Sequence, residues 1–259
     1  MTEKDRSEEV ARFLRQREEL GAGDLFMDGL TRDEALALVA HRRGAAVPTN
    51  RGAEQATSTE TETAPFPTPD TLDLSALDYD ALRQAAMGCQ RCRLARERCN
   101  VVFSDGNPTA RLMVVGEAPG ANEDRTGVPF VGQAGKLLDL MLASIDLSRR
   151  DSVYICNVIK CRPPGNRDPM QDEIELCSPY LKRQIELVAP EVILAVGTFS
   201  AKLLTGATKP LGRLRGKIYS YEGVPLIVTY HPAALLRNRG WTRPAWDDLQ
   251  LLRQVLDDR

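Results

Sequence analysis

The sequence lacks the features that direct a protein into or across a membrane. Its 259 residues contain no run of about 18 apolar residues, so no membrane-spanning helix is expected. The first ten residues, MTEKDRSEEV, are charged and do not include the apolar stretch of a secretory signal. We therefore expect a cytoplasmic protein.

Cysteine is scarce, with six residues, which argues against a disulfide scaffold in a chain of this size. In a reducing compartment, grouped cysteines more often bind a metal or take part in chemistry. Cys89 and Cys92 form a C-x2-C pair, a spacing that lets a tight turn direct both sulfurs at one metal. Cys161 and Cys177 form a second pair, with fifteen residues between them.

Four thiolates would suit either zinc or an iron–sulfur cluster, and the spacing does not decide between them. Buried, inert thiols are the plain alternative. A centre with four thiolate ligands would be structural, because no position is left open for a substrate.

The net charge of −2 is small but unevenly distributed. Residues 1–80 carry 9 basic and 17 acidic side chains, whereas residues 81–259 carry 25 basic and 19 acidic ones. A basic body with an acidic extension indicates an anionic partner such as nucleic acid, with ordinary scatter of surface charge as the alternative.

Composition divides the chain into three regions. Residues 1–44 have helical apolar spacing, which predicts an acidic helical extension. Residues 45–72 are rich in Thr, Pro, Glu and Ala and predict a flexible linker. Residues 73–259 predict one compact α/β domain.

Short apolar runs alternate with helical patterns in residues 73–259. The runs predict four buried strands, at residues 112–115, 153–155, 192–196 and 226–229. Helical spacing is found at residues 134–145, 171–188, 200–204 and 246–256. This alternation favours a central, mostly parallel sheet covered by helices on both faces. Ligands of such sheets bind beyond the carboxyl ends of the strands, so we expect the chemistry there.

Candidate functional residues follow three of these strands. The turn GEAPG at 116–120 allows close approach of the backbone to a ligand, but it matches no dinucleotide or phosphate fingerprint and could be a plain βα turn. Asn157 ends the second strand, where its amide could pair with a pyrimidine edge or bond its own backbone. His231, one of two histidines, follows the fourth strand, where a catalytic and a structural role are both open.

Other residues suggest contact with nucleic acid. Phe130 could stack on a base if it is exposed, or belong to the core. Arg162 lies in a basic loop at 160–167 that is suited to phosphates. Leu235 and Leu236, beside Arg237, could be helix core or an apolar wedge inserted between base pairs.

Together these segments resemble the family 4 uracil-DNA glycosylases, the iron–sulfur branch of the uracil-DNA glycosylase superfamily. The matching stretches occur in order and cover nearly all of residues 85–256. They are the C-x2-C at 89–92, GEAPG at 116–120, Glu123-Asp124, GVPFVGQAG at 127–135, CNVIKCRPPGNRDP at 156–169, Cys177 and HPAALLR at 231–237.

The resemblance implies a three-layer α/β/α fold, around the four-stranded sheet that the apolar runs predict, and a 4Fe–4S cluster. The cluster would be held by Cys89, Cys92, Cys161 and Cys177. In the implied substrate pocket, Phe130 stacks on a flipped uracil, Asn157 reads its pairing edge, and His231 donates to its O2.

The resemblance also implies further contacts around the reacting bond. Glu117 would lie beside the sugar and the attacking water, and Glu123 would lie near the uracil C5 and help to exclude the methyl group of thymine. Gly116 and Ala118 would also contact the substrate. Ala118 stands where other branches of the superfamily place an Asp or Asn to position water, which leaves Glu117 as the candidate. The implied DNA contacts are Leu235, Leu236, Arg237 and Arg162.

The implied reaction is hydrolysis of the N-glycosidic bond of uracil in single- or double-stranded DNA, leaving an abasic site for base excision repair. No lysine nucleophile occurs at the motifs, so a monofunctional enzyme without strand cleavage is expected. We expect a monomer associated with the nucleoid, whose N-terminal extension could bind a protein partner. A metal-stabilised DNA-binding module without catalysis and a nucleotide-binding α/β protein are the alternatives.

Overall fold

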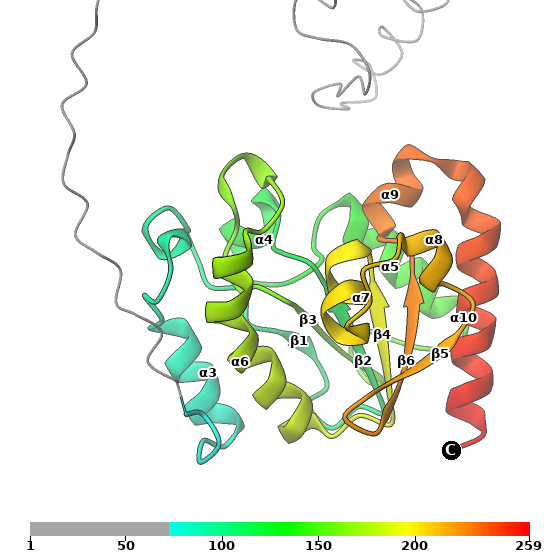
Figure 1. Cartoon of the computed structure of the whole chain (residues 1–259), viewed down its shortest axis with the longest axis horizontal. Helices are drawn as coiled ribbons and strands as arrows, with labels where there is room; N and C mark the ends of the chain where they lie inside the picture. Colours follow the sequence, from blue (N-terminus) through cyan, green and yellow to red (C-terminus); the bar gives the residue numbers. More distant parts are fainter. Residues whose placement is uncertain (1–72) are drawn as a thin grey trace, which may run out of the picture. The chain divides into compact units, whose positions relative to one another are not determined.

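The computed structural model describes residues 73–259, so the extension and linker predicted for residues 1–72 lie outside the described residues (Figure 1). A six-stranded sheet with the order β1-β3-β2-β4-β6-β5 forms the centre. The four inner strands are parallel and coincide with the four predicted strands. They are β3 (Val153–Asn157), β2 (Leu112–Gly116), β4 (Val192–Val196) and β6 (Val224–Thr229).

The predicted number of four strands is wrong, because two short antiparallel strands extend the sheet at its edges. β1 (Asp105–Gly106) pairs with β3, and β5 (Ile218–Tyr221) pairs with β6. β1 has only two residues, and β5 leaves every second side chain exposed. Neither strand contains the continuous apolar run that marks a buried strand in a sequence.

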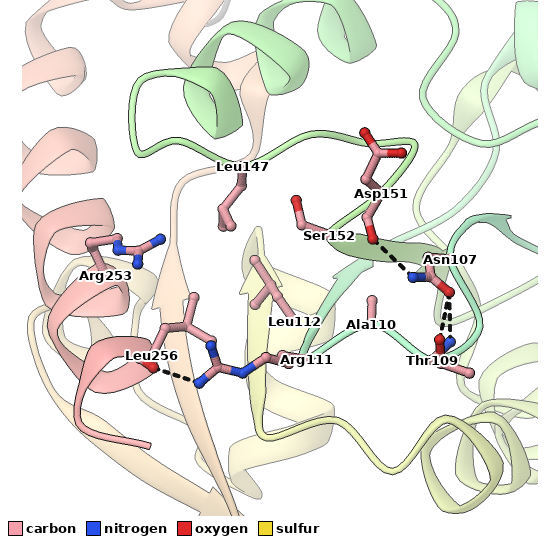
Figure 2. A pocket seen from close by; sticks show the side chains of 10 residues that line it. All are labelled: Asn107, Thr109, Ala110, Arg111, Leu112, Leu147, Asp151, Ser152, Arg253 and Leu256. Carbon is pink, nitrogen blue, oxygen red and sulfur yellow. Dashed lines mark hydrogen bonds between the residues drawn. The ribbon is translucent and has the colours of Figure 1, made fainter.

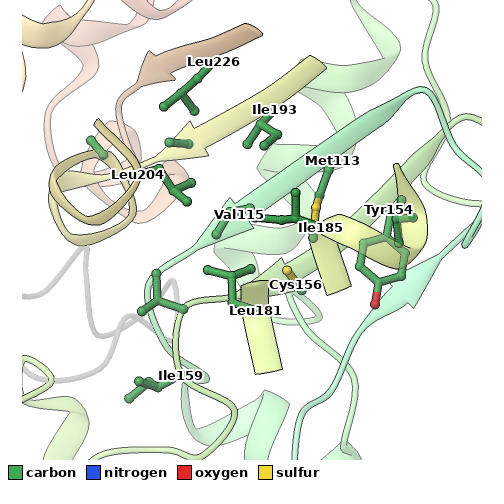
Figure 3. Close-up of a cluster of buried hydrophobic side chains, with 14 of the residues drawn as sticks. Met113, Val115, Tyr154, Cys156, Ile159, Leu181, Ile185, Ile193, Leu204 and Leu226 are labelled. Carbon is green, nitrogen blue, oxygen red and sulfur yellow. The ribbon is translucent and has the colours of Figure 1, made fainter. Parts of the chain in front are cut away.

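Helices cover both faces of the sheet, which confirms the three-layer α/β/α architecture. One face packs against α6 (Gln171–Val188) and α7 (Thr198–Thr205), through the buried cluster of Figure 3. The other face packs against α5 (Gln133–Ala143) and α10 (Thr242–Asp257). These four helices are the predicted ones, and α6 has the predicted bounds. Alternate residues of each inner strand face opposite layers, so the strands are apolar apart from Asn157 and Thr229 at the ends of β3 and β6.

The remaining elements are short. α3 (Tyr79–Met87) packs on α6 through a smaller cluster that includes Leu82 and Tyr180. The other short helices are η1 (Arg93–Arg96), α4 (Ala121–Thr126), η2 (Pro164–Asn166), α8 (Leu211–Leu214), α9 (Pro232–Arg237) and η3 (Arg239–Trp241). α4, η2 and α9 follow β2, β3 and β6, and α4 and α9 lie beyond the strand ends in Figure 1. None of the described helices is long and apolar enough to cross a membrane.

A small hollow of about 230 Å³ lies at the amino ends of β2 and β3 (Figure 2). Its polar groups already bond to one another: the Asn107 amide donates to the carbonyl of Asp151 at 2.8 Å, and Arg111 Nη2 donates to the carbonyl of Leu256 at 2.7 Å. Groups satisfied in this way gain little from a ligand. A larger cleft lies at the opposite end of the sheet.

Candidate active site

A cleft of about 920 Å³ opens at the carboxyl ends of the parallel strands. The segment after each inner strand contributes to its wall, through residues such as Glu117, Asn157, Thr198 and His231. β2 lies between β3 and β4, so the chain crosses over to opposite sides of β2. In sheets of this type, ligands bind at such a switch point.

Three residues from distant parts of the sequence meet in this cleft. The rings of Phe130 and His231 are stacked, with centroids 5.5 Å apart and an angle of 28° between the planes. A Cβ atom built on Gly116 would lie 2.3 Å from Asn157 Oδ1 and 2.5 Å from Phe130 Cζ. Gly116 is therefore the contact point between the Asn157 amide and the Phe130 ring, and a larger residue at 116 would displace one of them.

The Asn157 side chain is 1% exposed, and its Oδ1 atom is buried without a hydrogen-bond partner among the described residues. Leaving a buried acceptor unsatisfied costs about 1–3 kcal/mol. The register of the β2–β3 ladder, which pairs Gly116 with Asn157, fixes the position of this amide. The arrangement suits an acceptor that is held ready for an N–H group of a ligand.

His231 is held in one tautomer by the start of α9. Its Nδ1 accepts a hydrogen bond from the backbone N–H of Ala233 at 3.1 Å, so the neutral ring carries its proton on Nε2. Burial and the charge of Arg237 lower the pKa of His231 to about 4. The imidazole is therefore neutral at physiological pH and can donate from Nε2.

Glu117 lines the same cleft, one residue beyond β2. Burial and the nearby Asp168 carboxylate raise the pKa of Glu117 to about 7. Asp168 also lines the cleft, a position that was not predicted from the sequence. A carboxyl group with a pKa near neutrality can take up or release a proton under physiological conditions.

Arg149 holds the loop that presents Phe130, and no motif in the sequence pointed to it. Its Nη1 donates to the carbonyl of Pro129 at 2.9 Å, and its Nη2 donates to the carbonyl of Phe130 at 2.7 Å. Asp105 and Asp139 pair with the same guanidinium, at 3.0 and 2.8 Å. Phe130 has a φ of 54°, an unfavourable conformation for a residue with a side chain. The arginine stabilises this strained backbone.

Glu123 fixes the next two peptide units of the loop. Its Oε1 accepts hydrogen bonds from the backbone N–H groups of Val131 and Gly132, both at 2.9 Å. The carboxylate thereby satisfies free donors at the amino end of α5. The side chain still lines the cleft, as do Gly120 and Ala118.

Comparison with known proteins identifies the family. A sequence model of the uracil DNA glycosylase superfamily matches residues 103–250. The Type-4 uracil-DNA glycosylase of Sulfurisphaera tokodaii is 43% identical over 184 residues, which cover 68% of this chain and 84% of the relative. The chain belongs to the uracil-DNA glycosylase superfamily.

Within this superfamily, the chain belongs with the type-4 uracil-DNA glycosylases, as the resemblance indicated. The Type-4 enzyme of Archaeoglobus fulgidus is 47% identical over 165 residues, covering 61% of this chain and 82% of the relative. A Type-5 uracil-DNA glycosylase of Pyrobaculum aerophilum is 35% identical over 195 residues, covering 62% of this chain and 85% of the relative. The lower identity to the type-5 relative agrees with this placement.

Two of the four DNA contacts expected for a uracil-DNA glycosylase lie where a duplex could reach them. Leu236 is 50% exposed on α9, and Arg237 lines the cleft. Leu235 is 5% exposed and packs in the core layer of α5 and α10, which argues against the predicted DNA contact. Arg162 bonds Asn166 through its Nε at 2.7 Å and lies outside the cleft wall.

The four cysteines that a type-4 glycosylase is expected to use for a cluster line one small cavity, together with Arg98 and Lys160. Arg98 Nη1 donates to Cys161 Sγ at 3.2 Å, and the Lys160 backbone N–H donates to Cys177 Sγ at 3.4 Å. No group of three or more potential ligands in the described part of the chain could hold a single metal ion. Cys99 and Cys156 do not line this cavity.

Proposed function

We propose that this protein removes uracil from DNA by hydrolysing the bond between the base and its deoxyribose. The observation that carries the proposal is the meeting of Phe130, Asn157 and His231 around one cleft. The family supports it, since relatives that are 42–47% identical to this chain over the aligned residues are named Type-4 uracil-DNA glycosylase. A DNA-binding module without catalysis would have no use for this arrangement.

Asn157 would select uracil by its hydrogen-bonding pattern. Its Oδ1 lacks a partner and would accept from uracil N3–H, while its amide N–H would donate to O4. Cytosine presents an acceptor at N3 and a donor at the neighbouring position, so both contacts would become repulsive. A site built for one pattern rejects the other strongly, because its buried groups are left unpaired.

Phe130 and Glu123 would form the walls around the base. The Phe130 ring would stack on the flat face of the pyrimidine. Glu123, which bonds the loop after Phe130, would lie on the side of C5 and leave no room for the methyl group of thymine. Ala118, which lines the cleft, would contact the base, and Gly116 would allow Asn157 and Phe130 to approach each other behind it.

Breaking the C1′–N1 bond leaves negative charge on uracil and positive charge on the sugar. The neutral His231 would donate from Nε2 to O2 and stabilise the departing anion. Glu117, once ionised, would stabilise the cationic sugar and orient the attacking water. Both residues would bind the separated charges more tightly than the intact nucleotide, which is the condition for raising the rate.

Uracil in a duplex must leave the stack before it can reach these groups, at a cost of a few kcal/mol. Leu236 would occupy the space that the base vacates, and Arg237 would contact the neighbouring phosphates. Arg162 would contribute a further phosphate contact from its loop. Leu235 would support α9 from the core.

We further propose that Cys89, Cys92, Cys161 and Cys177 hold a 4Fe–4S cluster. The four cysteines line one common cavity, and the type-4 family supports a cluster there rather than zinc. The cluster would tie the segment before β1 to the loop after β3 and to α6. A purified sample should be yellow-brown and contain iron; a colourless protein with zinc would contradict this assignment.

The activity can be tested on a single-stranded oligonucleotide with one uracil, followed by alkali. We expect breakage at the uracil only after the alkali treatment, since a monofunctional glycosylase leaves an intact abasic strand. Matched oligonucleotides with thymine or cytosine at the same position should remain whole. Binding without any alkali-labile site would show that the protein is a DNA-binding module.

The same assay tests the role of Asn157. Asn157→Ala should lower the ratio of uracil to cytosine excision by about 10-fold or more, because each lost specific hydrogen bond is worth about 1–3 kcal/mol. An unchanged ratio would remove Asn157 from base selection.

We also propose that the protein acts as a monomer on single- and double-stranded DNA, in the cytoplasm at the nucleoid. The positive balance of residues 81–259 supports association with DNA. The acidic residues 1–72 would serve a protein partner rather than DNA. Size-exclusion chromatography of the full chain would test the monomer.

A further inference from the structure

A second aromatic pair lines the cleft, and the mechanism above does not use it. Tyr230 immediately precedes His231, and Trp241 ends η3. Their rings are stacked, with centroids 4.7 Å apart and 9° between the planes. This nearly parallel geometry differs from the edge-to-face contacts of Tyr79 with Phe103 and Tyr154 in the core.

A buried ion pair fixes the base of this stack. The guanidinium of Arg215 lies over the Tyr230 ring, with Cζ 4.3 Å from the centroid. Asp248, buried on α10, holds the Arg215 Nε at 2.7 Å, and Arg215 also donates to the carbonyl of Pro244. Tyr230 therefore contacts both the fixed guanidinium of Arg215 and the ring of Trp241. The Trp241 ring is preorganised and needs little further ordering to bind a ligand.

Trp241 is exposed, and several arginines lie close to it in the sequence. Trp241 is 38% exposed, although both it and Tyr230 line the cleft. Arg237, Arg239 and Arg243 lie within four residues of Trp241 in the sequence, and of these Arg243 pairs with Asp247 at 3.1 Å. Exposed aromatic rings among cations are the usual means of binding unpaired nucleic acid, because every base has a face on which to stack.

We propose that Trp241 is a stacking platform for an unpaired base next to the excised uracil on the same strand. The inference rests on the proposed function, which places the uracil itself against Phe130. Trp241 and His231 line one cleft, so a nucleotide next to a uracil held beside His231 has the Trp241 ring within the same cleft to stack on. Stacking is indifferent to base identity, so the platform adds affinity without sequence preference.

The fluorescence of Trp241 can be read alone, because the chain has only two tryptophans. Trp246, on α10 and outside the cleft wall, can be replaced by phenylalanine. In Trp246→Phe, a single-stranded oligonucleotide with an uncleavable 2′-fluoro-2′-deoxyuridine should quench the remaining emission. Abasic spacers are then placed one at a time at the positions next to the uracil analogue. The spacer at one of these positions, and at no other, should abolish the quenching. If none of the spacers changes the emission of Trp241, the proposal is wrong.

Kinetics provide a second test. Trp241→Ala should raise KM for single-stranded substrate about 10-fold, with kcat at saturation unchanged within about 2-fold, because the platform binds a base that does not react. Trp241→Phe, which keeps a ring, should retain most of the affinity. Trp246→Ala, an exposed tryptophan outside the cleft, is the matched control and should keep the wild-type KM.

The outcomes separate the platform from the proposed function. An unchanged KM in a folded Trp241→Ala protein that still releases uracil would refute the platform alone. Absence of uracil release by the wild-type protein would refute the proposed function, while the quenching would still report whether a base stacks on Trp241. Circular dichroism of each variant would show that it is folded.

Discussion

At the scale of single residues, the site depends on groups that the fold keeps neutral or without a partner. His231 is neutral because burial and Arg237 lower its pKa to about 4, and Asn157 Oδ1 has no hydrogen-bond partner among the described residues. The unpaired Asn157 acceptor costs stability at any pH, whereas the lowered pKa of His231 costs stability only as the pH falls below its ordinary value of about 6.5. The sequence could place these residues after strands but could not show their protonation or lack of partners, which depend on the packed surroundings.

His231→Ala should lower the single-turnover rate of uracil release by about 100- to 1000-fold, the usual effect of losing one donor to a developing anion. The substitution also removes the bond from Ala233 N–H that caps α9, so we expect a loss of stability of about 1 kcal/mol. Rapid-quench assays at saturating enzyme would measure the rate. A rate close to that of the wild type would exclude His231 from the chemistry.

The pH profile should report Glu117. Its pKa is raised to about 7, and the ionised form is the one that would stabilise the sugar cation. The single-turnover rate should therefore rise about tenfold per pH unit below 7 and level off above it. His231, with a pKa of about 4, stays neutral throughout this range. Glu117→Gln should give a slower, flat profile between pH 5 and 8; a profile that keeps its slope would assign the titration to another group.

At the scale of elements, the inner strands and main helices were predictable because each has an unambiguous pattern. β4 is apolar at every position, and the periodicity of residues 171–188 matches α6. The edge strands β1 and β5, and the side chains that hold the loop of Phe130, could not be predicted. Arg149 contacts loop carbonyls 19 and 20 residues away, a relation that no local pattern encodes. The two leucines of α9 look alike in the sequence, and only packing distinguishes buried Leu235 from exposed Leu236.

Arg149→Gln should weaken the binding of uracil without removing the chemistry. The loop would lose the donors to Pro129 and Phe130, and the stacking ring would sample other positions before binding. We expect KM and the inhibition constant of free uracil to rise together by about 10-fold. Arg149→Lys should restore only part of the affinity, because lysine keeps the charge but lacks the planar fork.

Arg253→Gln is the matched control for Arg149. Arg253 also joins a carboxylate, Asp257, to a backbone carbonyl, that of Ile145, but it lies at the opposite end of the sheet. Replacing Arg253 should leave KM and the inhibition constant of free uracil unchanged. Equal effects of the two substitutions would mean that Arg149 contributes only general stability.

At the scale of the whole molecule, the charge balance of the sequence favours an anionic ligand, and the architecture places the cleft at one end of the sheet. The positive balance of residues 81–259 was visible in the sequence, and so was the expectation of a site at the carboxyl ends of parallel strands. The gathering of four cysteines around one cavity was predictable as a set from their pairing. Its shape was not, because it depends on how the segment before β1 packs against α6.

Binding to uncleavable uracil DNA should weaken steeply with salt. Each neutralised phosphate lowers the logarithm of affinity by about 0.9 per decade of salt on duplex DNA and by about 0.7 on single strands. Fluorescence anisotropy between 50 and 200 mM salt would measure the slope, and Arg237→Gln should reduce it by about one such unit. A slope near zero would exclude DNA as the substrate.

The pairing of Gly116 with Asn157 in the central ladder has a consequence for how the protein can vary. Under the proposed function, the amide that would read the base and the glycine that lets Phe130 approach it are partners in the central strands of the sheet, not on separate loops. A shift of one residue between these strands would reverse every inward side chain of β3. The proposed choice of base would thus depend on the packing of the core strands, and a change of substrate would be reached more readily through residues on the outer walls of the cleft.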